Sequence, residues 1–197
     1  MYFILEILGT IAFAISGAMV GIEKKMDILG VVVLGITTAV GGGIIRDLII
    51  GEIPPAAFQK PVYVLVAIAV SIAVFIPAVN RRIDVNHPIL IVIDAIGLGV
   101  FTALGVRAGL SYNTFLQVFL GTVTGVGGGV LRDMFATEKP MIFVKHFYAC
   151  ASIIGAIVCA FLFKYDENAA MIAGIIVVFI LRILAARFKW HLPKSGR

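Results

Sequence analysis

Two copies of one short pattern place three glycines, an arginine and an aspartate inside apolar sequence. The copies are GGGIIRD at residues 41–47 and GGGVLRD at residues 127–133. A glycine inside a helix is less favourable than alanine by roughly 1 kcal/mol. Irregular backbone is tolerated at membrane depth only where it is buried in protein or lines a water-filled path. The pattern therefore predicts two glycine-broken helices that line a pore, with charged groups close by.

The predicted pore-lining helix breaks are Gly41, Gly42, Gly43, Gly127, Gly128 and Gly129. The alternative is close helix packing, which small residues promote throughout membrane bundles. We favour breaks for the triplets, because a triplet occupies most of the helix circumference and packing needs only one face. For Gly17 with Gly21 and for Gly105 with Gly109, the four-residue spacing favours packing.

The motif charges Arg46, Asp47, Arg132 and Asp133 lie just beyond the glycines and are still followed by apolar residues. Charges in such places are costly, and they are usually paired or face water. Consecutive residues do not face each other on a helix, so each Arg–Asp dipeptide is poorly placed to neutralise itself. We therefore expect crosswise pairing. Arg46 would bind Asp133, and Arg132 would bind Asp47. The alternative is that the four side chains reach separately to the two membrane interfaces.

Other ionisable groups carry weaker hypotheses. Glu6 and Asp94 lie in the first turns of their predicted helices, where the helix dipole favours a carboxylate, and a pore role is the lesser alternative. Arg182 lies near the end of the last predicted helix, and we expect it to extend to the membrane interface. The cysteines and histidines have no metal-binding or nucleophile spacing. We expect no catalytic residue, no metal and no cofactor, and the chain is not predicted to be an enzyme.

The elements that position these residues are long and apolar. Hydrophobic residues make up 61% of the 197 residues and charged residues 14%, whereas soluble domains carry about 25% charged residues. Apolar stretches of about twenty residues suit helices that cross a bilayer. We predict an all-α integral membrane protein with seven transmembrane helices. Their expected ranges are Phe3–Val20, Ile28–Ile50, Pro61–Val79, Pro88–Val106, Thr114–Phe135, Met141–Phe163 and Ala169–Ala186.

The chain also contains an internal repeat. Residues 34–54 align without gaps to residues 120–140, with eleven identities in twenty-one positions. The match extends backwards after a two-residue shift of register, which pairs Glu6 with Asp94 and Gly17 with Gly105. We predict one transmembrane domain over residues 1–197, with three-helix repeats at about 1–80 and 86–163. Three crossings per repeat give inverted topology, and a seventh helix at about 169–186 lies outside the repeats.

The basic residues lie in short connections and in the C-terminal tail, which is a membrane pattern and not a nucleic-acid footprint. One side of the predicted topology holds nine lysines and arginines and the other side three. The positive-inside rule then predicts a cytoplasmic C-terminus and an N-terminus outside. We expect the lipid bilayer, and no nucleic acid, as a partner.

With both motif copies in place, the sequence resembles bacterial members of the trimeric intracellular cation (TRIC) channel family. The resemblance rests on the doubled motif, the acidic-Gly-Phe-Gly pattern that heads each repeat, and the helix count. Glu6 stands where the family pattern has aspartate. The resemblance implies a homotrimer in the bacterial inner membrane, with a pore for monovalent cations, chiefly potassium, in each subunit. It also implies that the helices with Gly41–Gly43 and Gly127–Gly129 line that pore.

Three functions remain open on the residues alone. In a cation channel, carbonyls freed at the glycine breaks replace part of the hydration shell of the ion. Each break also offers positive half-helix ends beside an arginine, so the sequence does not determine the sign of the ion. Inverted repeats are equally typical of secondary transporters, here of a small zwitterion such as glycine. The third function is a structural subunit without a permeation path.

Overall fold

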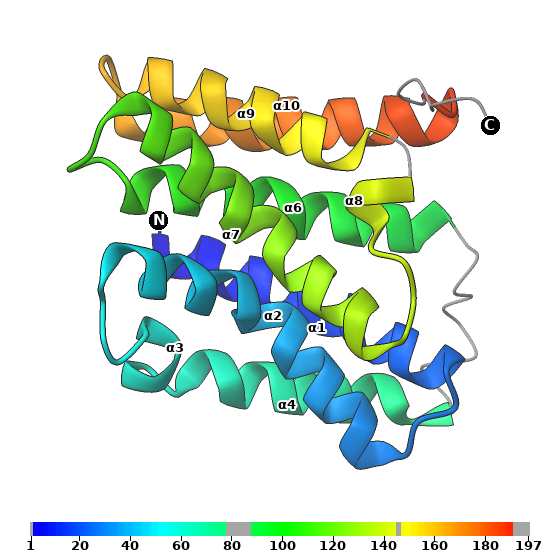
Figure 1. Cartoon of the computed structure of the whole chain (residues 1–197). Coiled ribbons are helices and arrows are strands. Elements are labelled where there is room, and N and C mark those ends of the chain that lie inside the picture. Colours follow the sequence, from blue (N-terminus) through cyan, green and yellow to red (C-terminus); the bar gives the residue numbers. More distant parts are fainter. Residues whose placement is uncertain (1, 78–87, 145–146, 191–197) are drawn as a thin grey trace.

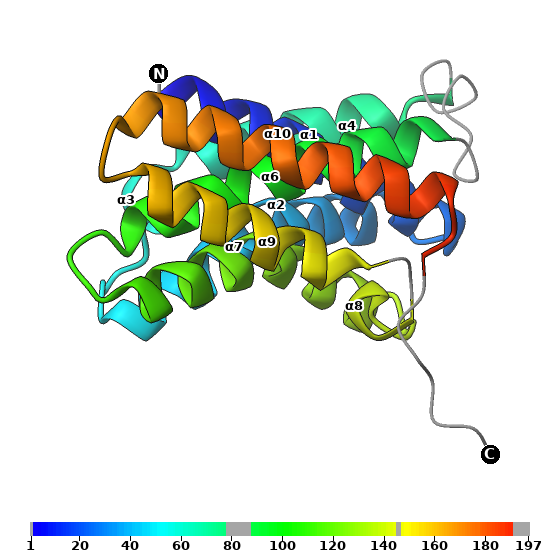
Figure 2. The ribbon, with the colours of Figure 1, turned by 90° about the horizontal axis from the view of Figure 1, so that it is seen from above.

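The chain folds into a bundle of helices that lie lengthwise beside one another (Figure 1). The computed structural model describes residues 2–77, 88–144 and 147–190, and these residues form helices and no β-strand. The N-terminus and the connections that follow α2, α6 and α9 lie at one end of the bundle. The connections that follow α1 and α7 lie at the other end, and the second view agrees (Figure 2).

The prediction of an all-helical membrane protein is confirmed. Among the described residues, five helices are long and apolar enough to cross a membrane: α1 Tyr2–Glu23, α2 Ile28–Ile50, α6 Pro88–Ala108, α7 Thr114–Phe135 and α10 Glu167–Arg187. Two further apolar helices are shorter, α4 Val62–Phe75 with 14 residues and α9 Tyr148–Leu162 with 15. Two single-turn helices, α3 Ala56–Gln59 and α8 Met141–Val144, precede them.

The sixth predicted helix, Met141–Phe163, is wrong as a single element. The described chain forms α8 first and begins α9 only at Tyr148, after Phe147 adopts a left-handed conformation with φ of 51°. The third predicted helix, Pro61–Val79, corresponds to α4, and residues 78–87 lie outside the described ranges. Apolar composition alone did not reveal that a separate short turn precedes α4 and α9.

Matching caps begin the two helices that carry the glycine motifs. The Asp27 carboxylate accepts a hydrogen bond from the Gly30 N–H at 2.8 Å at the start of α2. The Asn113 side chain accepts one from the Leu116 N–H at 2.9 Å at the start of α7. Each cap satisfies an amide that has no partner within the first turn of the helix. The residues that start the helices therefore repeat together with the motif.

Glycines bring α1 against α2 and α6 against α7, as their four-residue spacing predicted. A Cβ added to Gly17 would lie 2.6 Å from the Leu34 carbonyl oxygen. A Cβ added to Gly105 would lie 2.6 Å from the Leu120 carbonyl oxygen. Real side chains do not approach a backbone oxygen so closely, so both positions require glycine in this packing.

Burial is reversed relative to a water-soluble protein. Large apolar side chains such as Leu29, Phe115 and Phe143 are more than two-thirds exposed on the outside of the bundle. Charged side chains are buried instead, namely Asp47, Asp94, Arg132, Asp133 and Arg182. The expectation that Arg182 reaches the membrane interface is wrong, since only 3% of it is exposed. An apolar exterior around buried charge is the arrangement that a lipid environment favours.

Candidate functional site

The two glycine triplets meet where α2 crosses α7. A Cβ added to Gly42 would lie 2.2 Å from the Thr124 carbonyl oxygen, and one added to Gly128 would lie 2.1 Å from the Thr38 carbonyl oxygen. The two helices are therefore in backbone contact. The hydroxyls of Thr38 and Thr124 each donate to the carbonyl four residues earlier in their own helix, at 2.6 Å.

The predicted helix breaks at Gly41–Gly43 and Gly127–Gly129 are wrong, because α2 and α7 are continuous helices across both triplets. The rejected alternative, close packing, describes the first two glycines of each copy. Gly41 faces the Leu131 side chain, and Gly127 faces Gly42 across the crossing. The contact between the two backbones offsets the low helix propensity of glycine, so the helices need not open.

The third glycine of each triplet differs from the other two, because it faces polar groups. The nearest group to a Cβ added at Gly43 is the Arg46 guanidinium, at 3.8 Å. At Gly129 the nearest groups are the Tyr148 hydroxyl, at 3.3 Å, and the Arg132 guanidinium, at 3.7 Å. In each triplet, the first two glycines therefore pack at the helix crossing, and the third lies beside the arginine of the same motif.

Each motif arginine binds the aspartate that follows it, which we name the first centre at Arg46 and the second centre at Arg132. In the first centre, Nε and Nη2 of Arg46 lie 2.8 and 2.7 Å from Asp47 Oδ1. The other oxygen of Asp47 accepts a hydrogen bond from the Ala56 N–H at 2.8 Å. Asp47 therefore links the guanidinium to the first residue of α3.

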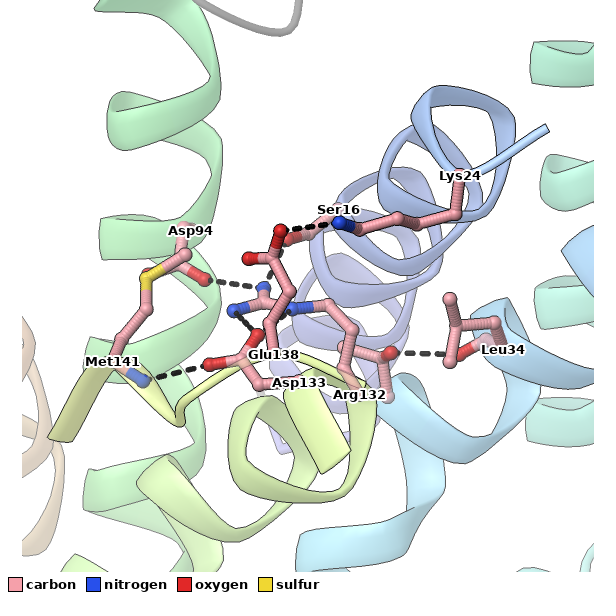
Figure 3. A network of polar contacts seen from close by, with 9 residues as sticks. Ser16, Lys24, Leu34, Asp94, Arg132, Asp133, Glu138 and Met141 are labelled. Atoms are coloured by element: carbon pink, nitrogen blue, oxygen red, sulfur yellow. Dashed lines mark hydrogen bonds and ion pairs between the residues drawn. The ribbon is translucent and has the colours of Figure 1, made fainter. Parts of the chain in front are cut away.

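The second centre repeats this geometry (Figure 3). Nε and Nη2 of Arg132 lie 2.9 and 2.8 Å from Asp133 Oδ1, and Asp133 Oδ2 accepts a hydrogen bond from the Met141 N–H at 2.7 Å. The expected crosswise pairs, Arg46 with Asp133 and Arg132 with Asp47, are therefore wrong. A flexible arginine stem can fold back beside its neighbour, and the short helices α3 and α8 supply the backbone N–H that completes each aspartate.

Arg132 has two further partners. Its Nη1 lies 2.6 Å from the Ser16 hydroxyl on α1 and 3.1 Å from Asp94 Oδ1 on α6. Only 1% of Arg132 is exposed. The guanidinium of Arg182 lies over the Tyr148 ring, 4.7 Å from its centre, so a second arginine approaches this centre from α10. Two arginines and two aspartates balance in formal charge there.

The second centre lies beneath an ion pair at the same end of the bundle (Figure 3). Lys24, just after α1, contacts Glu138, just after α7, at 2.5 Å. This hydrogen bond raises the pKa of the Lys24 ammonium above its ordinary value. Both side chains are partly exposed, and an exposed pair of this kind contributes little to stability.

The first centre opens onto a cavity of about 460 Å³, a volume that includes its open mouth. Five polar side chains from three helices, α1, α2 and α4, line it together with Gly43, namely Glu6, Thr10, Arg46, Asp47 and Tyr63. The Tyr63 hydroxyl donates a hydrogen bond to the Glu6 carboxylate. Within the described ranges, no group of three or more His, Cys, Asp or Glu side chains could hold a metal ion. The cavity can instead hold a small hydrated or polar species beside mixed charges.

The predicted site residues of each repeat thus lie together, in two separate places. Glu6, Gly43, Arg46 and Asp47 line the cavity. Their counterparts Asp94, Gly129, Arg132 and Asp133 form the closed second centre. Sequence reasoning missed Ser16, Tyr63 and Tyr148, and it wrongly assigned Arg182 to the membrane interface. A repeat alignment extended past the motif would have found the tyrosines, because Tyr63 and Tyr148 are 85 residues apart, as are the first residues of α3 and α8.

An apolar helical exterior around buried charge indicates an integral membrane protein, and polar and charged groups line its cavity. Comparison with known proteins narrows this class. A family described as Glycine transporter matches residues 3–78 and 91–164. The UPF0126 inner membrane protein YadS of Escherichia coli is 39% identical over 95% of this chain and 92% of that protein. A UPF0126 membrane protein of Vibrio cholerae is 37% identical over 98% of this chain and 81% of that protein.

Solved structures of TRIC channels are also similar to this chain. A TRIC cation channel superposes with a TM-score of 0.90 at 40% identity, over 98% of this chain and 97% of the other. A TRIC orthologue from Rhodobacter sphaeroides gives 0.86 at 32% identity, over 96% and 98%. A TRIC channel from C. elegans is 15% identical, with a TM-score of 0.64, and shares the fold. The chain belongs to the family of UPF0126 membrane proteins and prokaryotic TRIC channels, as its motifs predicted. Its structural neighbours are channels and not enzymes.

The backbone contact at the crossing gives a first prediction. Gly42→Ala places a methyl group against a backbone oxygen, and we expect the free energy of unfolding to fall by roughly 1–3 kcal/mol. Gly43→Ala in the same triplet meets nothing closer than 3.8 Å, and we expect it to leave stability unchanged or raise it by up to about 1 kcal/mol. Thermal unfolding in detergent measures both. Equal effects at the two positions would contradict the crossing described above.

The closed second centre gives a second prediction. Arg132→Gln leaves Asp94 and Asp133 buried without their cation, and breaking such a cluster costs roughly 3–5 kcal/mol. Arg46→Gln is the matched control, because the Arg46 side chain is 16% exposed at the cavity and water can hydrate Asp47. We expect the unfolding temperature to fall further for Arg132→Gln. A larger fall for Arg46→Gln would show that burial of the second centre does not determine its stability.

Proposed function

We propose that this chain forms a cation-selective channel in the bacterial inner membrane, with a permeation path in each subunit that includes the cavity at the first centre. The observation that carries this proposal is the cavity, which residues of α1, α2, α3, α4 and α6 line with polar and apolar groups inside a bundle with an apolar exterior. Family membership supports the proposal, since the TRIC structures at 32–40% identity are those of cation channels. Potassium, as the abundant cytoplasmic monovalent cation, is the proposed permeant ion.

The continuous helices change the proposed mechanism. Carbonyls freed at broken glycines are no longer needed, because α2 and α7 keep their helical form through the triplets. The side chains that line the cavity contact the ion instead, and Gly43 leaves space for it beside Arg46.

We propose a homotrimer of subunits that each contain seven transmembrane helices, two inverted three-helix repeats and α10 outside them. Several observations support the inverted arrangement. In Figure 1, α1 and α6 run in opposite directions, as do α2 and α7. The caps, the Arg–Asp pairs and the bonds to α3 and α8 also occur once in each half. The name of the Rhodobacter sphaeroides relative, a trimeric channel, supports the trimer.

The runner-up is a secondary transporter of a small zwitterion such as glycine. The cavity holds a guanidinium and two carboxylates, which could bind the carboxylate and the ammonium of an amino acid. The description of the matching family also names glycine. The channel is favoured because the solved relatives at 32–40% identity are channels.

Recording from the purified chain in planar bilayers tests the proposal. We expect unitary current steps and, under a tenfold KCl gradient, a reversal potential close to the potassium equilibrium potential. We expect unitary steps because a channel passes ions without a saturable binding cycle. We expect this reversal potential because the proposed channel selects cations. Radiolabelled glycine uptake into proteoliposomes is measured in parallel. Uptake without unitary currents would establish the transporter, and a reversal potential near the chloride equilibrium potential would overturn cation selectivity.

The charge distribution further predicts the orientation, with the N-terminus outside and the C-terminus cytoplasmic. In a background with Cys150→Ala and Cys159→Ala, an impermeant maleimide added to spheroplasts should label Ser111→Cys. It should label Lys139→Cys only after lysis. Both positions are exposed and lie in connections at opposite ends of the bundle. The opposite pattern of labelling would reverse the proposed orientation.

A further inference from the structure

The acidic residues near the start of the two repeats, Glu6 and Asp94, have different electrostatic surroundings. Asp94 binds Arg132 at 3.1 Å, and its charge is balanced within the buried second centre. Glu6 lines the cavity instead, where its observed hydrogen-bond partner is the Tyr63 hydroxyl, a neutral group. The repeat therefore places one acidic side chain against a cation and the other against an open, polar space.

The arginine in the cavity wall does not change this difference. Arg46 directs both Nε and Nη2 to one oxygen of Asp47, and the Ala56 N–H occupies the other oxygen. Seen from the cavity, the Arg46–Asp47 pair has no net charge. Among the described residues that line the cavity, Glu6, Arg46 and Asp47 carry formal charges. Their sum is one negative charge, and it is located at Glu6.

From this geometry we propose that Glu6 is the residue that determines the sign of the permeant ion, and that Tyr63 positions it. This inference rests on the proposed channel function. A net charge in a cavity inside the bundle attracts a cation and repels an anion much more strongly than it would in bulk water. The effect acts on both ions at once, so the permeability ratio of potassium to chloride responds more than either permeability alone.

The test compares Glu6→Gln with Glu52→Gln in planar bilayers under a KCl gradient. Glu52 follows the end of α2, is exposed and does not line the cavity, so its substitution removes the same charge outside the path. We expect the potassium-to-chloride permeability ratio to fall by roughly tenfold for Glu6→Gln, because the variant removes one unscreened charge from the cavity. We expect it to stay within about twofold of the parent for Glu52→Gln, since exposed charges are screened.

Two further variants separate charge from structure. Glu6→Asp keeps the charge, and we expect it to retain most of the parent selectivity. Tyr63→Phe keeps the ring but removes the hydroxyl that holds the carboxylate, and we expect an intermediate loss of selectivity with little change in thermal stability. A selectivity of Tyr63→Phe equal to that of the parent would remove the positioning role of Tyr63.

The possible outcomes separate this inference from the proposed function. If the parent channel is not cation-selective, the proposed function fails and this inference fails with it. If the parent is cation-selective and Glu6→Gln keeps its reversal potential, only this inference is overturned. Should Glu6→Gln not fold, the parent channel is recorded between 0.05 and 1 M KCl at a fixed gradient ratio, alongside Glu6→Asp. Selectivity that falls with added salt and persists in Glu6→Asp supports the assignment, and selectivity that is independent of salt overturns it.

Discussion

The bundle depends on backbone contact between α2 and α7. At Gly42 and Gly128 each helix lies against a carbonyl oxygen of the other, and no side chain could fit between them. Lipid tails provide no hydrophobic drive for helices to associate, so close van der Waals contact has to supply it. This contact fixes the distance between the two repeats. It also directs the Arg–Asp ends of the two motifs to opposite ends of the molecule, where they can act as separate centres (Figure 1).

A second constraint is that charge within the bundle needs complete partners. In each copy the aspartate accepts from the guanidinium with one oxygen and from the first amide of a short helix with the other. An unsatisfied amide at a buried helix start would cost free energy, and a single carboxylate satisfies it while also binding the arginine. The apparently irregular chain at α3 and α8 therefore serves the motif. The position of α8 also accounts for the late start of α9, at Tyr148.

Much of this structure could be predicted from local patterns. Apolar runs predicted the bounds of α2 and α7 to the residue, and the doubled motif located the arginine and the aspartate of each centre. The partner of each arginine could not be predicted. Helical geometry argues against Arg46 binding Asp47, and only the tertiary position of Ala56 makes that pair favourable. The glycine triplets were misjudged for a similar reason, because the cost of glycine is visible in the sequence but the crossing that offsets it is not.

The contrast between an open and a closed centre can be traced to one position on the helix that begins each repeat. In the register that pairs Glu6 with Asp94, Ser16 on α1 corresponds to Leu104 on α6. Ser16 binds the Arg132 guanidinium and holds it in the closed centre, where it also meets Asp94. Leu104 cannot accept a hydrogen bond, and it lines the cavity beside Arg46. Arg46 therefore binds Asp47 without a counterpart of the Ser16 contact, and the space that a guanidinium fills in one repeat remains open in the other. Two copies of one motif thus give two different sites because their neighbouring helices have diverged.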